Sequence, residues 1–263
     1  TGRRYLSWSQ VNSFRSCPRA FAFKYVEDAP PAFVSSNLLF GGAMHSALQA
    51  WFENRFEGTI VTVDELVQAY RVAWHERLEE QDGVPVRYGK GETADTLAQK
   101  AKDMLEAFAT SPLAEPVGDL IAVEERLSGS IADDLPDLLA IVDLIWADDA
   151  GLHVLDFKTS RSKWSDVKVA EARDQVRLYS RLASSIVEAG VDIHLHFGVL
   201  VKTKTPTVQK LDVPIAADTE DAIADVIRPV WHAMTLGVDY GNPSATACSG
   251  CPFRGRCPAV SSV

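Results

Sequence analysis

The four cysteines are the feature that most restricts the fold of this chain. Three of them stand near the C-terminus in the pattern C-x2-C-x5-C, at Cys248, Cys251 and Cys257, whereas Cys17 lies near the other end. Four is the number of thiolates that a tetrahedral sulfur site requires. Two disulfides are the alternative, which a cytosolic setting disfavours. We therefore expect one metal site that joins both chain ends, and the spacing alone does not distinguish zinc from a [4Fe–4S] cluster.

The composition limits the compartment and the partners. The chain has 263 residues, of which 46% are hydrophobic and 24% charged, as in ordinary globular domains. No apolar run approaches the roughly 20 residues that a membrane-spanning helix needs, and residues 1–8 do not have the layout of a signal peptide. We therefore expect a cytoplasmic protein without a membrane partner.

The net charge of −10 argues mildly against nucleic acid as a partner but does not exclude it. A protein that binds nucleic acid needs local basic surface rather than a high overall isoelectric point. Carboxylates that hold a metal ion also make the total more negative. The stretch 156–181 is locally basic, and its cations are Lys158, Arg161, Lys163, Lys168, Arg173, Arg177 and Arg181.

Hydrophobic periodicity predicts a helical first part followed by a mixture of strands and helices. Residues 7–25 have helical spacing, with Ser7 or Ser9 as N-cap and a break at Pro18. A second helix is expected over 38–56, entered through Gly41 and Gly42. The other predicted helices are 63–80, 93–110, 169–188 and 218–236. The predicted strands are 120–131, 138–147, 152–158, 194–202 and 207–213.

These elements divide the chain into three segments. Residues 1–118 form an N-terminal helical region that carries the first cysteine. Residues 119–214 form a core of strands with one long helix. Residues 215–263 form a C-terminal helix and an irregular tail that carries the last three cysteines.

Two acids and a lysine on neighbouring predicted strands form the richest chemical pattern. Asp143 stands in the apolar run LAIVDLIW, where a buried charge is costly unless something offsets it. Asp156 and Lys158 are two apart in VLDFKTS, so both point to the same face of a strand. Two carboxylates and an ammonium that converge can hold a divalent cation and position a water for attack on phosphorus. The short D-x-K pattern by itself is more often that of a structural ion pair on a strand.

Three further polar residues accompany this pattern. His45 stands among apolar residues of a predicted helix, and Gln175 and Tyr179 are four apart on another, which places them on one face. Each of them taken alone also fits an ordinary core or surface residue. Their value as site residues depends on how the motifs combine.

The order of the motifs resembles that of the iron–sulfur nucleases in the RecB-like branch of the PD-(D/E)XK nuclease superfamily. This group comprises the CRISPR-associated adaptation nucleases, the AddB-type nuclease domain and stand-alone RecB-family exonucleases. The resemblance runs nearly from end to end of the chain. It rests on six segments in the order of the family: LSWSQVNSFRSCPRAFAFKYV, GGAMH, IVDLIW, VLDFKTS, DQVRLY and CSGCPFRGRC.

The resemblance implies an α/β fold, with a restriction-endonuclease-like mixed central sheet flanked by helices. It implies that His45, Asp143 and Asp156, helped by the backbone carbonyl of Phe157, bind Mg²⁺ or Mn²⁺. Lys158 would orient or help to deprotonate the attacking water and offset the charge that develops on phosphorus.

The resemblance also implies roles for residues around this centre. Gln175 and Tyr179 would support Lys158 or contact DNA. Arg161, Lys163 and Arg177 would follow the phosphates. The four cysteines Cys17, Cys248, Cys251 and Cys257 would hold a [4Fe–4S] cluster, with Zn²⁺ as the alternative.

Two positions require a choice. Pro136 and Asp137 spell the dipeptide of the superfamily, but Asp143 has the better strand context and the better spacing to Asp156. The family also often carries a glutamate on the preceding strand. Glu124 and Glu125 both qualify, strand alternation turns only one of them inwards, and we slightly favour Glu124.

The implied function is metal-dependent hydrolysis of DNA by an exonuclease, with endonuclease action as a further option. The substrate would be single-stranded DNA or DNA with free ends, in DNA repair, recombination or CRISPR adaptation. No helicase motif is apparent in the sequence, so unwinding would need a helicase partner, and CRISPR adaptation proteins are the alternative partners. Two rival hypotheses are a catalytically silent DNA-binding module and a zinc-stabilised scaffold protein.

Overall fold

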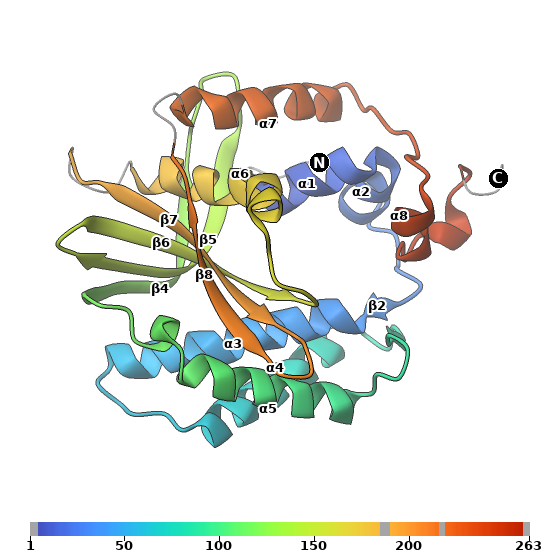
Figure 1. The fold of residues 1–263 in the computed structure, drawn as a ribbon. Coiled ribbons are helices and arrows are strands. Elements are labelled where there is room, and N and C mark those ends of the chain that lie inside the picture. The colour runs from blue at the N-terminus through green and yellow to red at the C-terminus, as the bar shows by residue number, and fades with distance from the viewer. Residues whose placement is uncertain (1–4, 185–189, 216–218, 260–263) are drawn as a thin grey trace.

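A mixed β-sheet lies at the centre of the molecule, with helices on both of its faces (Figure 1). The structure is a computed structural model that describes residues 5–184, 190–215 and 219–259. Within them, the strands of this sheet are β1 (Tyr5–Ser7), β4 (Asp119–Gly129), β5 (Asp137–Asp148), β6 (Gly151–Ser160), β7 (Ile193–Val201) and β8 (Thr207–Val213). The predicted α/β fold with a mixed central sheet flanked by helices is confirmed.

Five of these strands follow the order β1-β5-β6-β7-β8, and β4 also pairs with β5. The contacts β4–β5, β5–β6 and β7–β8 are antiparallel, whereas β1–β5 and β6–β7 are parallel. The predicted three-stranded meander is therefore β4, β5 and β6. Strand β1 was not predicted, because it is three residues long and too short to show a periodic pattern.

The helices form two layers, each with its own hydrophobic core (Figure 1). On one face of the sheet pack α3 (Ser36–Phe56), α4 (Val63–Glu79) and α5 (Ala94–Ala109). On the other face pack α1 (Trp8–Ser16), α6 (Asp166–Ala183) and α7 (Thr219–Thr235). The remaining elements are α2 (Pro18–Tyr25), α8 (Ala245–Ser249), β2 (Val34–Ser35), β3 (Val86–Arg87) and the short turns of 3-10 helix Pro112–Ala114 and Arg254–Arg256. In the described ranges, no helix combines the length and the apolar character needed to cross a membrane.

Local signals in the sequence account for most helix ends. Ser7 caps α1 in a capping box with Gln10, and Pro18 is the first residue of α2, where its missing N–H costs nothing. Thr62 and Thr93 cap α4 and α5 in the same manner. The predicted helix 169–188 corresponds to α6, which Ser165 caps; residues 185–188 of that prediction, and residue 218 of the next, lie outside the described residues.

One helix entry was predicted wrongly. The glycines Gly41 and Gly42 do not open α3 but lie within it, because Ser35 caps the helix by accepting a hydrogen bond from the amide of Asn37. Glycine inside a helix costs roughly 1 kcal/mol relative to alanine, so a pair of them needs a tertiary reason. The side chains packed against these two positions supply one.

Candidate active site

The sheet divides at the two predicted acids. Strands β5 and β6 pair in register from Asp148 and Gly151 as far as Leu144 and Leu155. Beyond that last pair, β6 remains paired with β7 along its whole length, whereas β5 continues alongside β4 and then β1. Asp143 and Asp156 are the first residues past the point where the two strands part. A one-residue change of register on either strand would separate them.

We call the place where β5 and β6 separate the fork. There, a side chain of β5 replaces the backbone hydrogen bonds between the two strands. Oδ2 of Asp143 accepts a hydrogen bond of 2.5 Å from the backbone N–H of Phe157. The N–H and C=O of a strand residue point to the same side of the strand, so the Phe157 carbonyl also faces β5. This places the carbonyl that was predicted as a metal ligand on the side of the strand where Asp143 lies.

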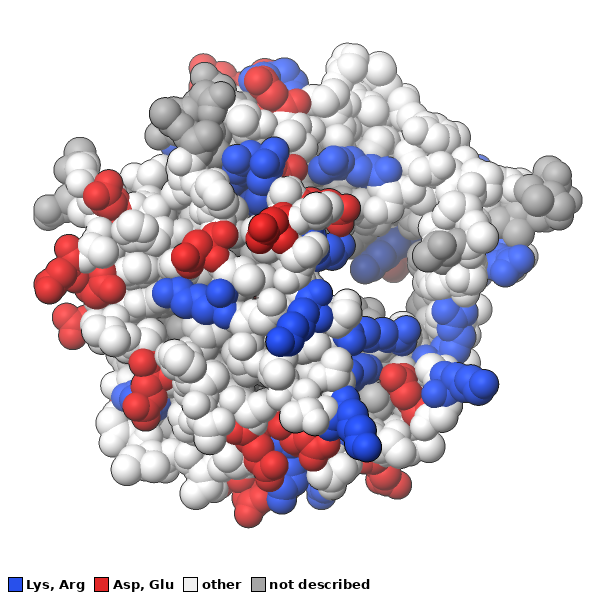
Figure 2. All heavy atoms as spheres, viewed as in Figure 1, with Lys and Arg blue, Asp and Glu red and all other residues white. Residues whose placement is uncertain are grey.

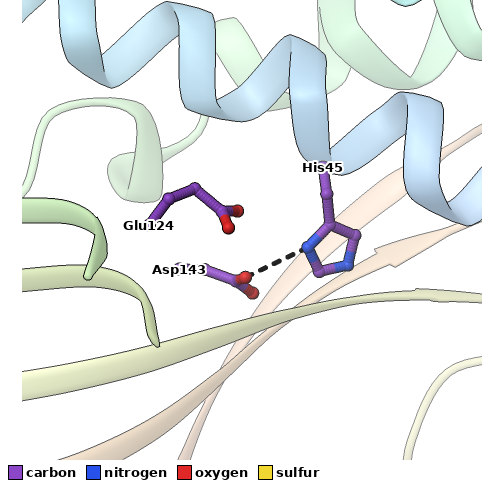
Figure 3. Close-up of side chains that lie close together, drawn as sticks. All are labelled: His45, Glu124 and Asp143. Atoms are coloured by element: carbon purple, nitrogen blue, oxygen red, sulfur yellow. Dashed lines mark hydrogen bonds and ion pairs between the residues drawn. The ribbon is translucent and has the colours of Figure 1, made fainter. Parts of the chain in front are cut away.

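A histidine and two acids converge at the fork (Figure 3). Ligand atoms of His45, Glu124 and Asp143 all lie within 4.8 Å of one another, and the three side chains point toward one another from α3, β4 and β5. Nδ1 of His45 stands 3.1 Å from Oδ1 of Asp143. Of the two candidate glutamates, Glu124 is the one that belongs to this group.

The backbone at Glu124 explains how it reaches the group. Its φ angle is +51°, a conformation that non-glycine residues rarely adopt and that turns a strand residue out of regular alternation. Across from it on β5, Val142 and Ile145 pack in the same hydrophobic core although they are three positions apart. Strict alternation therefore fails on both strands at this point.

The trio fits a small divalent cation. The 3.1 Å between Nδ1 of His45 and Oδ1 of Asp143 is a hydrogen-bond distance. The ligand atoms of all three residues lie within 4.8 Å of one another, so one cation can contact all of them. The two carboxylates are donors that Mg²⁺ and Mn²⁺ prefer, whereas the imidazole is a donor more usual for softer divalent ions. A cation at the fork would also neutralise the acids that meet there.

Asp156 sits deeper and is engaged by protein groups. It is 2% exposed, and its Oδ2 stands 2.6 Å from Nζ of Lys158. The hydroxyl of Tyr179 donates to Oδ1 at 3.2 Å, and Nε2 of Gln175 donates to that hydroxyl at 2.6 Å. The pair Gln175–Tyr179 thus holds Asp156 and reaches Lys158 only through it.

The charges at the fork perturb one another's protonation. Burial, together with the neighbouring Asp143 carboxylate, raises the pKa of Glu124 to about 7. Burial also raises the pKa of Asp156, although Lys158 opposes the shift. Burial acts to lower the pKa of His45, but Asp143 and Asp156 outweigh it and the net shift is upwards. These acids repel one another until a proton or a cation is shared among them.

The predicted phosphate-binding residues differ in their surroundings. Arg161 lines a pocket of about 200 Å³ together with Lys202, and Lys163 is exposed on the loop after β6. Arg177 has only 13% of its side chain exposed and lies 3.8 Å from Asp174, so it is the least available of the three. Figure 2 shows Lys and Arg side chains around a hollow in this face of the molecule, between the α2–α6 side and the α3 side.

Asp137 lies apart from the fork. It is the first residue of β5, it is exposed, and it pairs with Tyr5 on β1. At about 3.4 Å per strand residue, six positions separate it from Asp143 by on the order of 20 Å.

The four cysteines lie together although they come from opposite ends of the chain. They line one cavity of about 320 Å³ between α2 and the C-terminal tail, and none of them forms a disulfide. Burial raises the pKa of the Cys251 thiol, and the three other cysteines add to the rise while a hydrogen bond from Phe253 opposes it. Among the described residues, which include all four cysteines, no three sulfurs lie within 4.8 Å of one another.

Direct contacts also join the two chain ends. The amide of Ala32 donates to the carbonyl of Pro252 at 3.0 Å, and the amide of Arg19 donates to the carbonyl of Tyr240 at 3.0 Å. Arg19 also forms an ion pair of 2.6 Å with Asp239. The tail is therefore docked on α2 and on the segment that follows it, and α2 and α8 lie side by side in Figure 1.

A mixed sheet that forks at two acids, with a lysine two positions after the second, defines the class of nuclease cores with a D…D-x-K centre. The sequence model of the PD-(D/E)XK nuclease superfamily matches residues 5–258. The chain belongs to this superfamily. No match was found among the curated proteins.

Two solved structures match this chain at low sequence identity. A "putative exonuclease" from Eubacterium rectale is 13% identical, with a TM-score of 0.54 over 89% of this chain and 80% of that chain. The protein SSO0001 is 12% identical over 95% of this chain and 93% of that chain, but its TM-score of 0.36 is too low to carry an argument. At these identities the first likeness shows the fold alone.

Proposed function

We propose that this chain is a Mg²⁺- or Mn²⁺-dependent deoxyribonuclease, an exonuclease that acts on single-stranded DNA or on DNA ends. The observation that carries the proposal is the fork between β5 and β6, where Asp143, Asp156 and Lys158 meet His45. Membership of a nuclease superfamily supports the reaction class. The name of the Eubacterium rectale protein agrees with exonuclease action.

The residues at the fork would have different roles in hydrolysis. His45, Glu124 and Asp143 would hold the cation, together with Asp156 and the Phe157 carbonyl. When bound, the cation polarises the phosphate and lowers the pKa of a coordinated water. Lys158, held 2.6 Å from Asp156, would direct this water toward phosphorus and offset the negative charge of the transition state.

Nucleic acid as substrate is supported by local positive charge on the molecular surface. The hollow bordered by Lys and Arg side chains in Figure 2 offers positive charge to a strand despite the acidic total. Arg161 and Lys163 follow directly after β6, which carries Asp156. We place the activity in DNA repair, recombination or CRISPR adaptation, with a helicase or CRISPR adaptation proteins as partners.

For the cysteine site we favour a [4Fe–4S] cluster over zinc. The four sulfurs line one cavity and none of them forms a disulfide. A [4Fe–4S] cluster takes four thiolates, one on each iron. The order of the cysteines along the chain resembles that of the iron–sulfur nucleases.

A cleavage assay tests the proposed function. The purified protein is incubated with linear and with circular single-stranded DNA, with Mg²⁺, Mn²⁺ or EDTA. We expect cation-dependent degradation of the linear substrate, and cutting of the circle would reveal endonuclease action. Asp143→Ala and Asp156→Ala should each abolish cleavage, because each removes an anionic group from the fork, while the matched control Asp137→Ala should cut normally.

Other outcomes identify the rival hypotheses. Tight DNA binding without cleavage under any of these conditions would favour a catalytically silent binding module. A colourless protein with one zinc per chain, and with neither binding nor cleavage, would favour the scaffold. Full activity in Asp156→Ala would contradict the assignment of the fork as the active site.

A further inference from the structure

A glycine of α3 makes room for an arginine that has no role so far. Gly42 stands one helical turn before His45. A Cβ atom on Gly42 would come within 2.3 Å of Nε and 3.0 Å of Cδ of Arg77, on α4. Contacts that short do not persist, and the flexible arginine would be the group to move. The Arg77 side chain therefore packs in the space that the missing side chain of Gly42 leaves free.

The other glycine of the pair has a different neighbour. A Cβ atom on Gly41 would meet Oγ1 of Thr159, at the end of β6, at an ordinary 3.6 Å. The position of Arg77 therefore depends on Gly42 and not on Gly41. The two glycines of GGAMH can be tested separately.

Arg77 has hydrogen-bonding capacity to spare. Its Nη1 donates to the carbonyl of Ala73, on its own helix, at 3.3 Å. Among the residues that the structure describes, no ion pair involves Arg77, and Glu80 is the carboxylate that lines the same cavity. A guanidinium carries five donors and keeps its charge at any physiological pH, so most of these donors remain for a ligand.

Arg77 and His45 line the same cavity, whereas Glu124, Asp143 and Asp156 are not among its lining residues. A cavity of about 470 Å³ is lined by Arg77, Gly42 and His45, and also by Asn37. Asn37 borders the pocket of Arg161 and Lys202 as well. Gly42 and His45 are three apart on α3 and so share one face of the helix, with about 5–6 Å between their Cβ positions. Arg77 and His45 therefore border one cavity, and through His45 this cavity adjoins the fork.

We propose that Arg77 binds a backbone phosphate of the substrate strand, next to the phosphate that is cut. The planar guanidinium matches two phosphate oxygens at once, which lysine does not. Gly42 is then the positioning residue that admits this guanidinium to the cavity. The inference rests on the proposed function, because it assumes that a nucleic acid strand enters the fork.

The test pairs the arginine with one charge on DNA. Single-stranded oligonucleotides with one uncharged methylphosphonate, moved along the strand position by position, are cut in single-turnover reactions by the wild type and by Arg77→Ala. Arg77→Ala should cut unmodified DNA about 10- to 100-fold more slowly. At one position the methylphosphonate should slow the wild type and have no further effect on the variant. Equal slowing of both proteins at every position would overturn the proposal.

Three further variants separate phosphate binding from a structural role. Gly42→Ala should reproduce the slow cleavage of Arg77→Ala with little change in thermal midpoint, because only a flexible side chain must move. Gly41→Ala is the matched control on α3, and Arg71→Ala, an exposed position on α4, is the control for charge. Wild-type rates are expected for both controls. A loss with Arg71→Ala as large as that with Arg77→Ala would contradict a specific contact.

DNA binding keeps the test decisive if the wild type does not cut. Affinity for the unmodified oligonucleotide is measured by fluorescence anisotropy at several salt concentrations, in an Asp156→Ala background. Arg77→Ala should reduce the slope of log K against log salt by about 0.7, the value for one phosphate contact on a single strand. If the wild type does not cut DNA and Arg77→Ala still reduces the slope, the proposed function is wrong and Arg77 remains a phosphate ligand. An unchanged slope, or no binding at all, would overturn the inference.

Discussion

At the scale of single residues, the buried acids at the fork make the stability of the folded protein depend on pH. The pKa of Glu124 is raised from 4.5 to about 7 by burial and by Asp143. In the metal-free protein at a pH between these two values, Glu124 is therefore protonated in the folded state and ionised in the unfolded chain. The stability from this proton is fully present below about 4.5 and is lost as the pH rises through about 7.

Replacement of this acid by an amide tests the argument. Glu124→Gln keeps the shape of the side chain and removes the titrating group. We expect the thermal midpoint of the EDTA-treated wild type to fall between about pH 5 and about pH 8, and that of the variant to fall less. Saturating Mn²⁺ should reduce the difference between the two, because a cation replaces the proton. Identical pH profiles without metal would show that Glu124 is not perturbed by its neighbours.

At the scale of elements, α6 positions the acid that β6 carries. Gln175 and Tyr179 lie on one face of α6, and the tyrosine hydroxyl reaches the buried carboxylate of Asp156 at 3.2 Å. Tyr179→Phe retains the packing of the ring and removes that hydrogen bond. Groups that orient a metal-binding residue typically contribute about 10- to 100-fold in affinity or rate.

The expected result for Tyr179→Phe is a weaker metal site in an otherwise intact fold. The concentration of Mn²⁺ that gives half-maximal cleavage should rise, and excess Mn²⁺ should restore much of the rate. Phe14→Leu, which changes an aromatic residue of α1 instead, is a control for general loosening of this helical layer. A Tyr179→Phe variant with unchanged metal dependence would show that α6 does not orient Asp156.

At the scale of the whole molecule, the cysteine site closes nearly the entire chain into one loop. Closing a long loop restricts the unfolded state most in the simple entropic account, and metal–thiolate bonds add to folding free energy. Cys17→Ala should abolish the broad absorbance at about 400 nm that an anaerobically prepared [4Fe–4S] protein shows, and should lower the thermal midpoint. Activity should fall as an indirect consequence.

A control separates the cluster from the ordinary contacts of the tail. Asp239→Ala removes the partly exposed ion pair with Arg19 and leaves all four thiols in place. It should keep the colour and change stability by about 1 kcal/mol or less. A Cys17→Ala variant that retains about four irons per chain would refute a shared cluster.

Local patterns in the sequence were sufficient for most of the secondary structure. The periods of 3.6 and 2 located α4, α5 and the strands from β4 to β8, because an amphipathic element repeats its apolar residues along one face. The same context favoured Asp143, inside an apolar run, over Asp137. The structure places Asp143 at the fork and Asp137 at an exposed strand end.

Tertiary structure decided what depends on residues far apart in the chain. Alternation could not choose between Glu124 and Glu125, because the strand departs from it where φ is +51°. No local rule shows that Tyr179 reaches Asp156, or that Arg77 rests on Gly42. The sequence by itself determined the elements and the chemical groups, since these follow from neighbours along the chain. Their partners were set only when β5 and β6 parted and the helices packed on the sheet.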